Sequence, residues 1–506
     1  MRSVAAVLAS IRTFTILGVD AHEVRVEADV SGGLPSFALV GLPDTAVRES
    51  RERVRAAIAN SGFKFPNTRI TANLAPADLR KAGPGFDLAI AAAVLVASEQ
   101  LHAEQVDGVV LAGELALDGA IRPVPGTFAI TRAAARSAAS AVAVAERCAP
   151  EAALAAGVRV VPIGRLRDLE RLGTDDEPPP PQPLRADGEG DAPSLPDLAD
   201  LRGQPYLRRG LELAAAGGHS LLMTGPPGAG KSMAAMRLPS LLPPLDDAEA
   251  GEAIRVASAC GRPIEPLLTR RRPYRAPHHT ISTAGLIGGG SPPRPGEITL
   301  AHRGVLFLDE LAEFRRDALE ALRQPVESGR VLIARARRVL ELPCRFQLVA
   351  AANPCPCGRG EGSPECECPP QSVRRYSTKL SGALADRVDM LIAVAQPDPA
   401  ALGGPPGERS AAVRERVLAA RERQRRRLGP GRCNAEMAPP ETRRWCAPDP
   451  AGAPLLAEVL EGGALSGRGH ERILRLARTI ADLAGRDRIG ADELAEALAL
   501  RRRGRR

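Results

Sequence analysis

The sequence predicts a multidomain α/β protein, and three observations lead to this fold class. A chain of 506 residues is too long for one ordinary hydrophobic core. Apolar strands alternate with helical segments after residue 202, which is typical of a parallel sheet with helical crossovers. Residues 173–201 are rich in proline and acids and have no apolar period, which indicates a linker.

The predicted domains follow one another along the chain. In residues 1–172, "TFTILGVDAHEVRVEADV" alternates as strands do and "DTAVRESRERVRAAIANSG" has helical spacing, so we expect mixed α and β structure. Residues 202–404 contain the apolar strands "HSLLMTG", "GVLFLDEL" and "FQLVAAANP", which predict a parallel sheet. Residues 405–506 are helical and rich in arginine, and we expect a small helical lid there.

Composition excludes a membrane protein. Hydrophobic residues make up 44% of the chain and charged residues 25%, and no run approaches the roughly 20 apolar residues of a membrane span. The N-terminal apolar stretch contains an arginine and leads into strand-like sequence, so we expect no signal peptide and a cytoplasmic location. The net charge is +8, and the basic runs at 421–432 and 500–506 could neutralise nucleic-acid phosphates or form a solvated surface.

The stretch "GPPGAGKS" fits the phosphate-binding pattern G-x4-G-K-S between a strand and a helix. It predicts an ATP site in which glycines let backbone N–H groups surround the phosphates, Lys231 reaches the β and γ oxygens, and Ser232 ligates Mg²⁺. The predicted loop residues are Gly225, Pro226, Pro227, Gly228, Ala229, Gly230, Lys231 and Ser232.

Polar residues end two later strands of the same domain. Asp309 and Glu310 follow "GVLFL", and Asn353 follows "FQLVAAA". Ligands of open α/β sheets bind at this strand edge, so we expect Asp309 to hold Mg²⁺, Glu310 to activate the attacking water, and Asn353 to orient water or the γ-phosphate. The alternative for the acidic pair is a helix cap.

Two arginines are candidates to stabilise the transition state. The order of phosphate loop, acidic pair and polar strand end is that of an AAA+ motor, in which an arginine such as Arg387 reaches the γ-phosphate of a neighbouring subunit. A local salt bridge with Asp386 or Asp389 is the alternative. In the helical lid, Arg468 is the candidate for a second phosphate sensor that acts in cis, on the nucleotide of its own subunit, ahead of Arg472.

Longer stretches carry a resemblance to one family. "RAPHHTISTAGLIGGGSPPRPGEITLAHRGVLFLDEL", "NPCPCG" and the N-terminal "PSFALVGLPDTAVRESRERVRAAI" resemble the magnesium chelatase-like AAA+ proteins of the ComM (YifB) group over nearly the whole chain. The resemblance implies an ATP-driven homo-oligomeric ring, a hexamer in that family. It also implies a partner in single-stranded and branched DNA, and promotion of branch migration in recombination and natural transformation.

In that family the first domain resembles the proteolytic domain of Lon. Its protease chemistry needs a serine activated by a lysine. Aligned with that pattern, this chain has Gly85 in place of the serine and Phe128 in place of the lysine. We therefore expect residues 1–172 to form a Lon-like scaffold that assembles a ring or binds DNA, without protease activity.

Four of the nine cysteines lie within fourteen residues, as Cys355, Cys357, Cys366 and Cys368. Four thiolates suit tetrahedral Zn²⁺, although the one-residue gaps are tighter than the usual C-x2-C, and ordinary loop cysteines are the alternative. A zinc clip would close the insertion 355–368 between Asn353 and the candidate finger. Cys344 is close enough in sequence to be a spare ligand.

A hairpin is predicted at 328–346, before the strand that ends in Asn353. Arg335, Arg337 and Arg338 lie near its predicted tip, where they could contact DNA phosphates or be solvated strand residues. The pair His278 and His279 suggests metal or DNA contact, but packing is favoured.

Two functions compete with the DNA motor. One is a chelatase-type AAA+ motor that remodels a protein partner. The other is an interaction protein that holds ATP as a structural ligand, which would not need Glu310 or Arg387.

Overall fold

The computed structural model describes residues 8–42, 44–185, 194–290, 293–335, 338–360, 364–381, 384, 387–461 and 467–501. The chain forms two compact units. Unit 1 comprises Met1–Gly188, Ile254–Leu268 and Ser291–Arg294. Unit 2 comprises Glu189–Ala253, Thr269–Gly290 and Pro295–Arg506.

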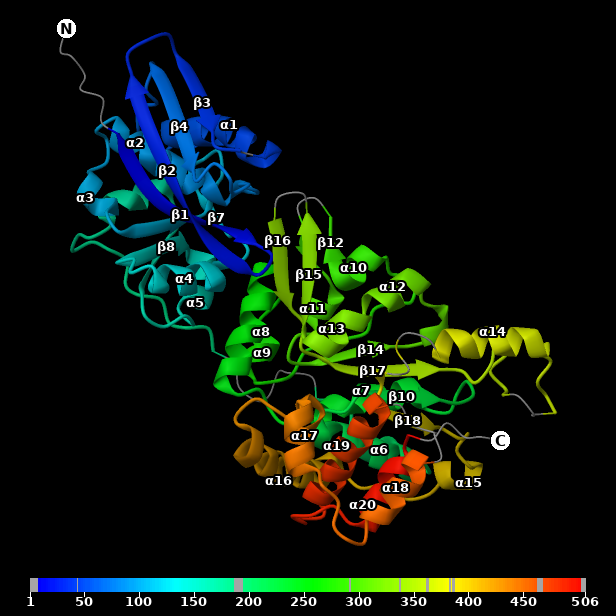
Figure 1. Ribbon diagram of the computed structural model, residues 1–506. Coiled ribbons are helices and arrows are strands. Elements are labelled where there is room, and N and C mark those ends of the chain that lie inside the picture. Colours follow the sequence, from blue (N-terminus) through cyan, green and yellow to red (C-terminus); the bar gives the residue numbers. More distant parts are fainter. Residues whose placement is uncertain are drawn as a thin grey trace. The chain divides into compact units, whose positions relative to one another are not determined.

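Unit 1 is built on a seven-stranded sheet in the order β3-β4-β2-β1-β5-β8-β9 (Figure 1). The β1–β2 and β2–β4 pairs are antiparallel, and the other neighbouring pairs are parallel. The strands of unit 1, with the short β6–β7 ladder, are β1 Ala9–Leu17, β2 Asp20–Ser31, β3 Ser36–Val40, β4 Arg69–Ala75, β5 Val109–Ala112, β6 Glu114–Leu115, β7 Ile121–Arg122, β8 Ala141–Ala145 and β9 Arg159–Ile163. The helices are α1 Thr45–Asn60, α2 Asp87–Ala97, α3 Ala103–Val106, α4 Thr127–Arg136, α5 Ala149–Ala152 and α9 Glu265–Leu268.

The core of unit 1 surrounds α2. All eleven residues of this helix are buried, because its sequence is apolar on every side after Asp87. The buried Asp87 carboxylate is paired with Arg53 of α1, whose Nε donates to it over 2.7 Å. Phe128, at the position where the Lon dyad has its lysine, is 5% exposed and belongs to the packed interior.

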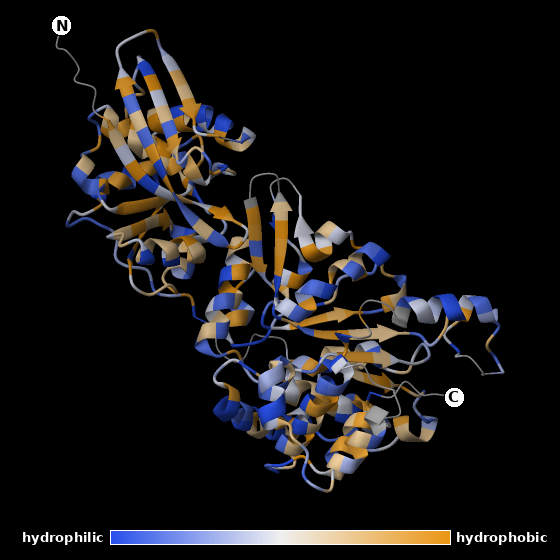
Figure 2. Ribbon diagram, viewed as in Figure 1, coloured by the Kyte–Doolittle hydropathy of each residue, from blue (hydrophilic) through white to orange (hydrophobic). Residues whose placement is uncertain are grey.

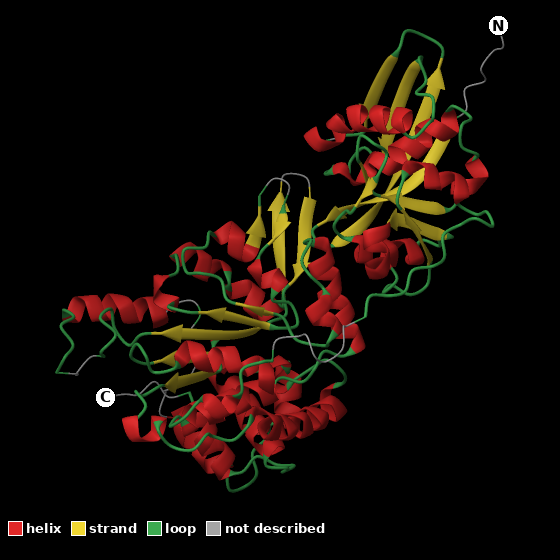
Figure 3. Cartoon of the chain, turned by 180° about the vertical axis from the view of Figure 1, so that it is seen from behind, coloured by secondary structure: helices red, strands yellow, loops and turns green. Residues whose placement is uncertain are grey.

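Unit 2 contains a five-stranded sheet in the order β11-β14-β17-β10-β18. Every neighbouring pair in it is parallel, as the alternation of strands and helices predicts. Its strands are β10 Leu221–Thr224, β11 Tyr274–Arg275, β14 Val305–Leu308, β17 Gln347–Ala352 and β18 Met390–Ala393. Helices lie on both sides of the sheet (Figure 3). Strand β14 and, after its first residue Gln347, strand β17 are therefore continuously apolar (Figure 2) and buried.

The helices of unit 2 include five in the C-terminal region. The C-terminal α16 and α19 pack against α6, and their apolar side chains join the core of the sheet domain. The helices are α6 Pro205–Gly217, α7 Lys231–Leu241, α10 Thr283–Ile287, α11 Glu297–Leu300, α12 Arg316–Ala321, α13 Arg323–Ser328, α14 Pro370–Ser381, α15 Pro399–Leu402, α16 Ser410–Leu428, α17 Pro439–Trp445, α18 Ala453–Glu461, α19 Gly467–Leu483 and α20 Ala491–Ala499. Helix α8, Asp247–Ala259, has residues in both units.

Besides the β6–β7 ladder, two short ladders of the described residues lie outside the main sheets. The predicted hairpin before β17 is present, as the antiparallel pair β15 Arg330–Arg335 and β16 Arg338–Pro343 (Figure 1). The second ladder joins β12 Gly288–Gly289 and β13 Arg294–Pro295. Within the described ranges, no helix has the length and apolarity that a membrane crossing requires.

Candidate functional site

The phosphate loop connects the end of β10 to the start of α7. Its glycines are required by the backbone: Gly228 and Gly230 have φ of +77° and +89°, which side chains rarely adopt. Gly225 is required by its neighbour, because a Cβ there would lie 2.2 Å from the carbonyl oxygen of Val394, just after β18. The loop is thus shaped by the sheet edge beneath it.

Lys231 is the centre of the polar contacts in this loop. Its Nζ donates to the carbonyl oxygens of Gly225 and Pro226 over 2.6 and 2.8 Å, and to Oδ1 of Asn353 over 3.1 Å. Burial lowers the pKa of Lys231, while the charges of Asp309 and Glu310 act in the opposite direction. The ammonium group is therefore held between the loop and the end of β17, where Asn353 was predicted to act.

The predicted magnesium ligands are in direct contact. Ser232 Oγ, on the first turn of α7, donates to Oδ2 of Asp309 over 2.6 Å. Asp309 directly follows β14, and this strand pairs with β17, which pairs with β10. A hydroxyl and a carboxylate oxygen are ligands that Mg²⁺ accepts.

Glu310 has an unusual backbone and a partner that sequence reasoning missed. Its φ is +51°, in the left-handed region, and its N–H donates to Oδ1 of Asp309 over 2.9 Å. Its Oε2 lies 3.2 Å from Nδ1 of His279, whose ring is tilted by 33° against that of His278 with centroids 4.1 Å apart. The sequence alone carried no signal for this contact, because it depends on the parallel pairing of β11 with β14, which brings the segments after both strands to the same sheet edge.

Arg387 lies at the opposite edge of this sheet. It precedes β18, and its backbone carbonyl accepts from Ser220 Oγ, just before β10. Its Nε is 3.1 Å from Oε1 of Glu327 at the end of α13, a partner that was not expected from sequence. Of the two expected partners, Asp389 contacts Arg472 over 3.3 Å, and Asp386 lies outside the described residues, so that alternative stays a prediction. Arg468 contacts the same Oε1 of Glu327 over 3.3 Å.

A cavity of about 650 Å³ opens at this amino edge of the sheet. Among the described residues that line it, nine are arginines and five are carboxylates, and Arg387, Arg472 and Glu327 belong to it. The surplus of guanidinium groups makes the cavity suited to an anion.

The four clustered cysteines converge in space. Their sulfur atoms all lie within 4.8 Å of one another, with Cys355 3.3 Å from Cys357 and 3.8 Å from Cys366. Four sulfurs bound to Zn²⁺ at about 2.3 Å stand about 3.8 Å apart, so the donor set fits a tetrahedral metal. Backbone N–H groups of Cys357 and Gly360 donate to Cys368 and Cys355, which would orient and stabilise thiolate ligands.

The predicted DNA contacts are placed only in part. Arg335 and Arg338 are opposite each other at the end of the β15–β16 ladder, but their side chains lie outside the described residues, as does Arg337 as a whole. Their proposed role therefore stays a prediction. Cys344, the possible spare ligand, is buried, and burial raises its pKa to about 12.

Comparison with known proteins places this site in a family. Three models match: "Magnesium chelatase, subunit ChlI" over residues 197–402, "Subunit ChlI of Mg-chelatase" over 26–147, and "Magnesium chelatase, subunit ChlI C-terminal" over 407–501. The chain belongs to the magnesium chelatase-like AAA+ family. Membership confirms the predicted family and fold class, and this AAA+ family implies ATP and Mg²⁺ as ligands of the phosphate-loop site.

Relatives of this magnesium chelatase-like chain extend over its full length. "Uncharacterized protein YifB" of Escherichia coli is 43% identical over 98% of this chain and 97% of the relative. "Competence protein ComM" of Haemophilus influenzae is 43% identical over the same shares. A shorter similarity, 32% identity over 31% of this chain and 37% of the relative, is to "Holliday junction branch migration complex subunit RuvB" of Nocardia farcinica.

Proposed function

We propose that this protein is an ATP-hydrolysing ring motor that moves branched DNA in the cytoplasm during recombination or transformation. One observation carries the hydrolytic part: Lys231 joins the phosphate loop to Asn353, and Ser232 joins it to Asp309, so the residues of three strands meet at one sheet edge. Binding alone would not need a carboxylate such as Glu310 beside them.

Each residue of this edge has a defined task in hydrolysis. Mg²⁺ bound with ATP would neutralise phosphate charge, held by Ser232 and Asp309. Lys231 would exchange its carbonyl partners in the loop for phosphate oxygens, which are stronger acceptors for an ammonium group. Glu310, whose side chain is 56% exposed, can take a proton from the attacking water, and Asn353 can orient that water.

The position of Arg387 supports a ring. Arg387 precedes β18, whereas the phosphate loop lies at the opposite, carboxyl edge of the sheet. The four residues of β18 between these edges span about 13 Å. An arginine at the amino edge is therefore poorly placed for its own nucleotide and suited to the nucleotide of a neighbouring subunit. A repeated contact of this head-to-tail kind forms a ring when the rotation between subunits closes.

The DNA substrate rests on the relatives and on charge. A full-length relative is named as a competence protein, and a partial one as a subunit of a Holliday junction branch migration complex. The hairpin residues Arg335, Arg337 and Arg338 are the proposed phosphate contacts. We also propose that the four-cysteine centre holds Zn²⁺ as a structural ion.

A protein-remodelling motor is the second candidate. The observation that favours it is the match of residues 197–402 to the magnesium chelatase subunit itself. Such a motor would use the same hydrolytic residues and would not require DNA.

The deciding experiment follows a labelled four-way DNA junction with the purified full chain, MgATP and low salt. We expect ATP-dependent conversion of the junction into duplex products, and none with Glu310→Gln, which keeps the shape of the side chain and removes the base. ATP hydrolysis with neither junction movement nor stimulation by DNA would reject the DNA motor and support the protein remodeller. No hydrolysis by the wild type would reject both.

A further inference from the structure

The cysteine centre lies against the phosphate loop. Gly358, the residue after Cys357, is packed so tightly on Pro227 that a Cβ at this position would lie 2.6 Å from Pro227 Cδ and 2.8 Å from Cγ. Its φ of +85° and a hydrogen bond from its N–H to the carbonyl of Cys355, over 3.0 Å, fix this approach. The turn that carries two of the four sulfurs is therefore a wall of the loop that would bind phosphates.

A second connection runs through Asn353. Only Pro354 separates it from Cys355, and its side chain accepts the hydrogen bond from Lys231. Its backbone is hydrogen bonded to Tyr376, which is 8% exposed on α14, just beyond the last of the four cysteines. Both ends of the cysteine segment thus meet at the residue that contacts Lys231.

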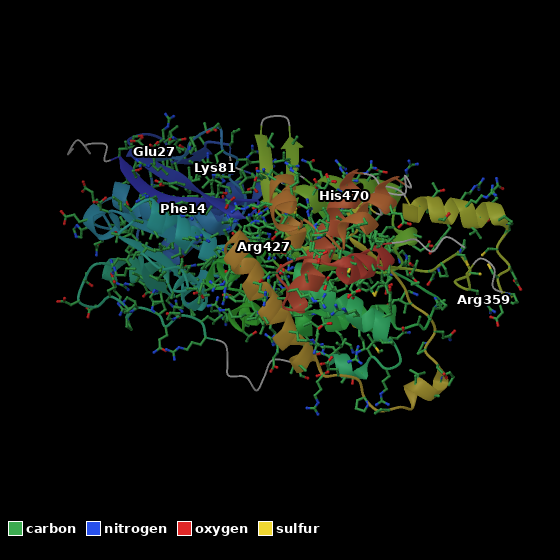
Figure 4. The ribbon with its side chains drawn as sticks, turned by 60° about the horizontal axis from the view of Figure 1, so that its bottom comes forward. Phe14, Glu27, Lys81, Arg359, Arg427 and His470 are labelled. Carbon is green, nitrogen blue, oxygen red and sulfur yellow. The ribbon has the colours of Figure 1, made fainter. Side chains whose placement is uncertain are left out.

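The cysteine segment lacks the residues that would form an apolar core of its own. Between Cys355 and Cys368 the side chains are small or charged, without one large apolar residue, so burial of apolar surface cannot offset the entropy of ordering the loop. Arg359 is at the periphery of the structure in Figure 4, with its side chain 54% exposed. A metal bound by four thiolates would supply free energy for ordering this loop, because metal binding and local folding are coupled.

We infer that metal occupancy of the four-cysteine centre sets the conformation of the phosphate loop, so that a zinc-type cation controls ATP binding in this protein. The inference rests on the proposed ATP site. It assigns the centre a regulatory role: loss of the ion frees the turn at Gly358, removes the support of Pro227, and weakens the nucleotide complex while Lys231 and Asp309 remain intact.

The first test uses two glycines of the same turn. Gly358→Ala would push on Pro227, whereas a Cβ at Gly360 lies 3.6 Å from Pro354 Cγ, an ordinary contact. Both glycines have positive φ, +85° and +94°, so the backbone strain is matched. We expect one zinc per chain in wild type and both variants, a Kd for MgATP raised about tenfold in Gly358→Ala, and a change under about twofold in Gly360→Ala.

The second test removes the ion from the unmodified full chain. A chelator should raise the Kd for MgATP, and Zn²⁺ added back should restore it, with metal content measured at each step. Unchanged affinity in the metal-free protein, equal affinity in the two glycine variants, or absence of zinc from the wild type would each overturn the inference. If the zinc-loaded wild type fails to bind MgATP at all, the proposed function fails instead.

Discussion

Glu310 combines a strained backbone with a side chain that has a defined neighbour. A residue other than glycine in the left-handed region costs on the order of 1 kcal/mol, and such strain persists where the surroundings impose it. Here the imposing contacts are the N–H bond to Asp309 and the His279 ring at 3.2 Å. The carboxylate of Glu310 therefore points toward the ring of His279.

We predict that His279 positions Glu310 for proton transfer. His279→Gln should lower kcat for ATP about tenfold and leave the Kd for MgATP unchanged, because only the base is displaced. His278→Ala is the control, since His278 is the exposed neighbour of His279 and the ion pair to Glu310 is made by His279. Steady-state kinetics give kcat, and separate binding measurements give the Kd for MgATP. A rise in kcat in His279→Gln would contradict the prediction and would mean that His279 restrains Glu310.

At the scale of elements, sequence reasoning was reliable where local chemistry is strong. The phosphate loop, the strands ending at Asp309 and Asn353, and the hairpin before β17 follow from glycine spacing, apolar runs and alternation, and the structure contains them. These signals are short in range, so a single sequence carries them.

Contacts between segments that only the strand order of the sheet brings together could not be predicted from the sequence in the same way. His279 meets Glu310 only because β11 pairs with β14, and Arg387 meets Glu327 because α13 ends beside β18. Gly358 contacts Pro227 because the cysteine loop after β17 lies against the phosphate loop after β10, the strand that pairs with β17. Each of these contacts joins two residues that are at least 30 positions apart in the sequence. Composition and periodicity do not identify which residues meet over such a separation.

The β15–β16 hairpin yields a prediction about salt dependence. If Arg335, Arg337 and Arg338 each neutralise a phosphate, their joint replacement by alanine should weaken DNA binding and reduce the slope of log affinity against log salt by about 2 to 3. Arg330→Ala is the control, because it lies at the other end of the hairpin and pairs with Glu341 over 3.2 Å. An unchanged slope in the triple variant, measured by fluorescence anisotropy across a salt series, would exclude the hairpin as the phosphate contact.

At the scale of the whole molecule, unit 2 presents different chemistry at the two edges of its parallel sheet. The carboxyl edge carries Lys231, Asp309 and Glu310, and the amino edge carries the arginine-lined cavity with Arg387. Glu327 contacts both Arg387 and Arg468 there, so the two guanidinium groups share one carboxylate in a single protomer. A triphosphate from a neighbour would offer Arg387 a stronger acceptor than this carboxylate.

This division predicts that two inactive variants restore one another. Arg387→Ala keeps its own phosphate site but offers no finger, and Glu310→Gln keeps the finger but cannot activate water. In equal mixtures about a quarter of head-to-tail interfaces would pair an intact site with an intact arginine, so ATP hydrolysis should return well above that of either variant alone. Lys231→Ala mixed with Glu310→Gln is the negative control, because both changes disable the same edge and leave every interface incomplete. Failure of the first mixture to recover activity, with mixed assembly verified by differently tagged subunits, would show that Arg387 does not act across a subunit boundary.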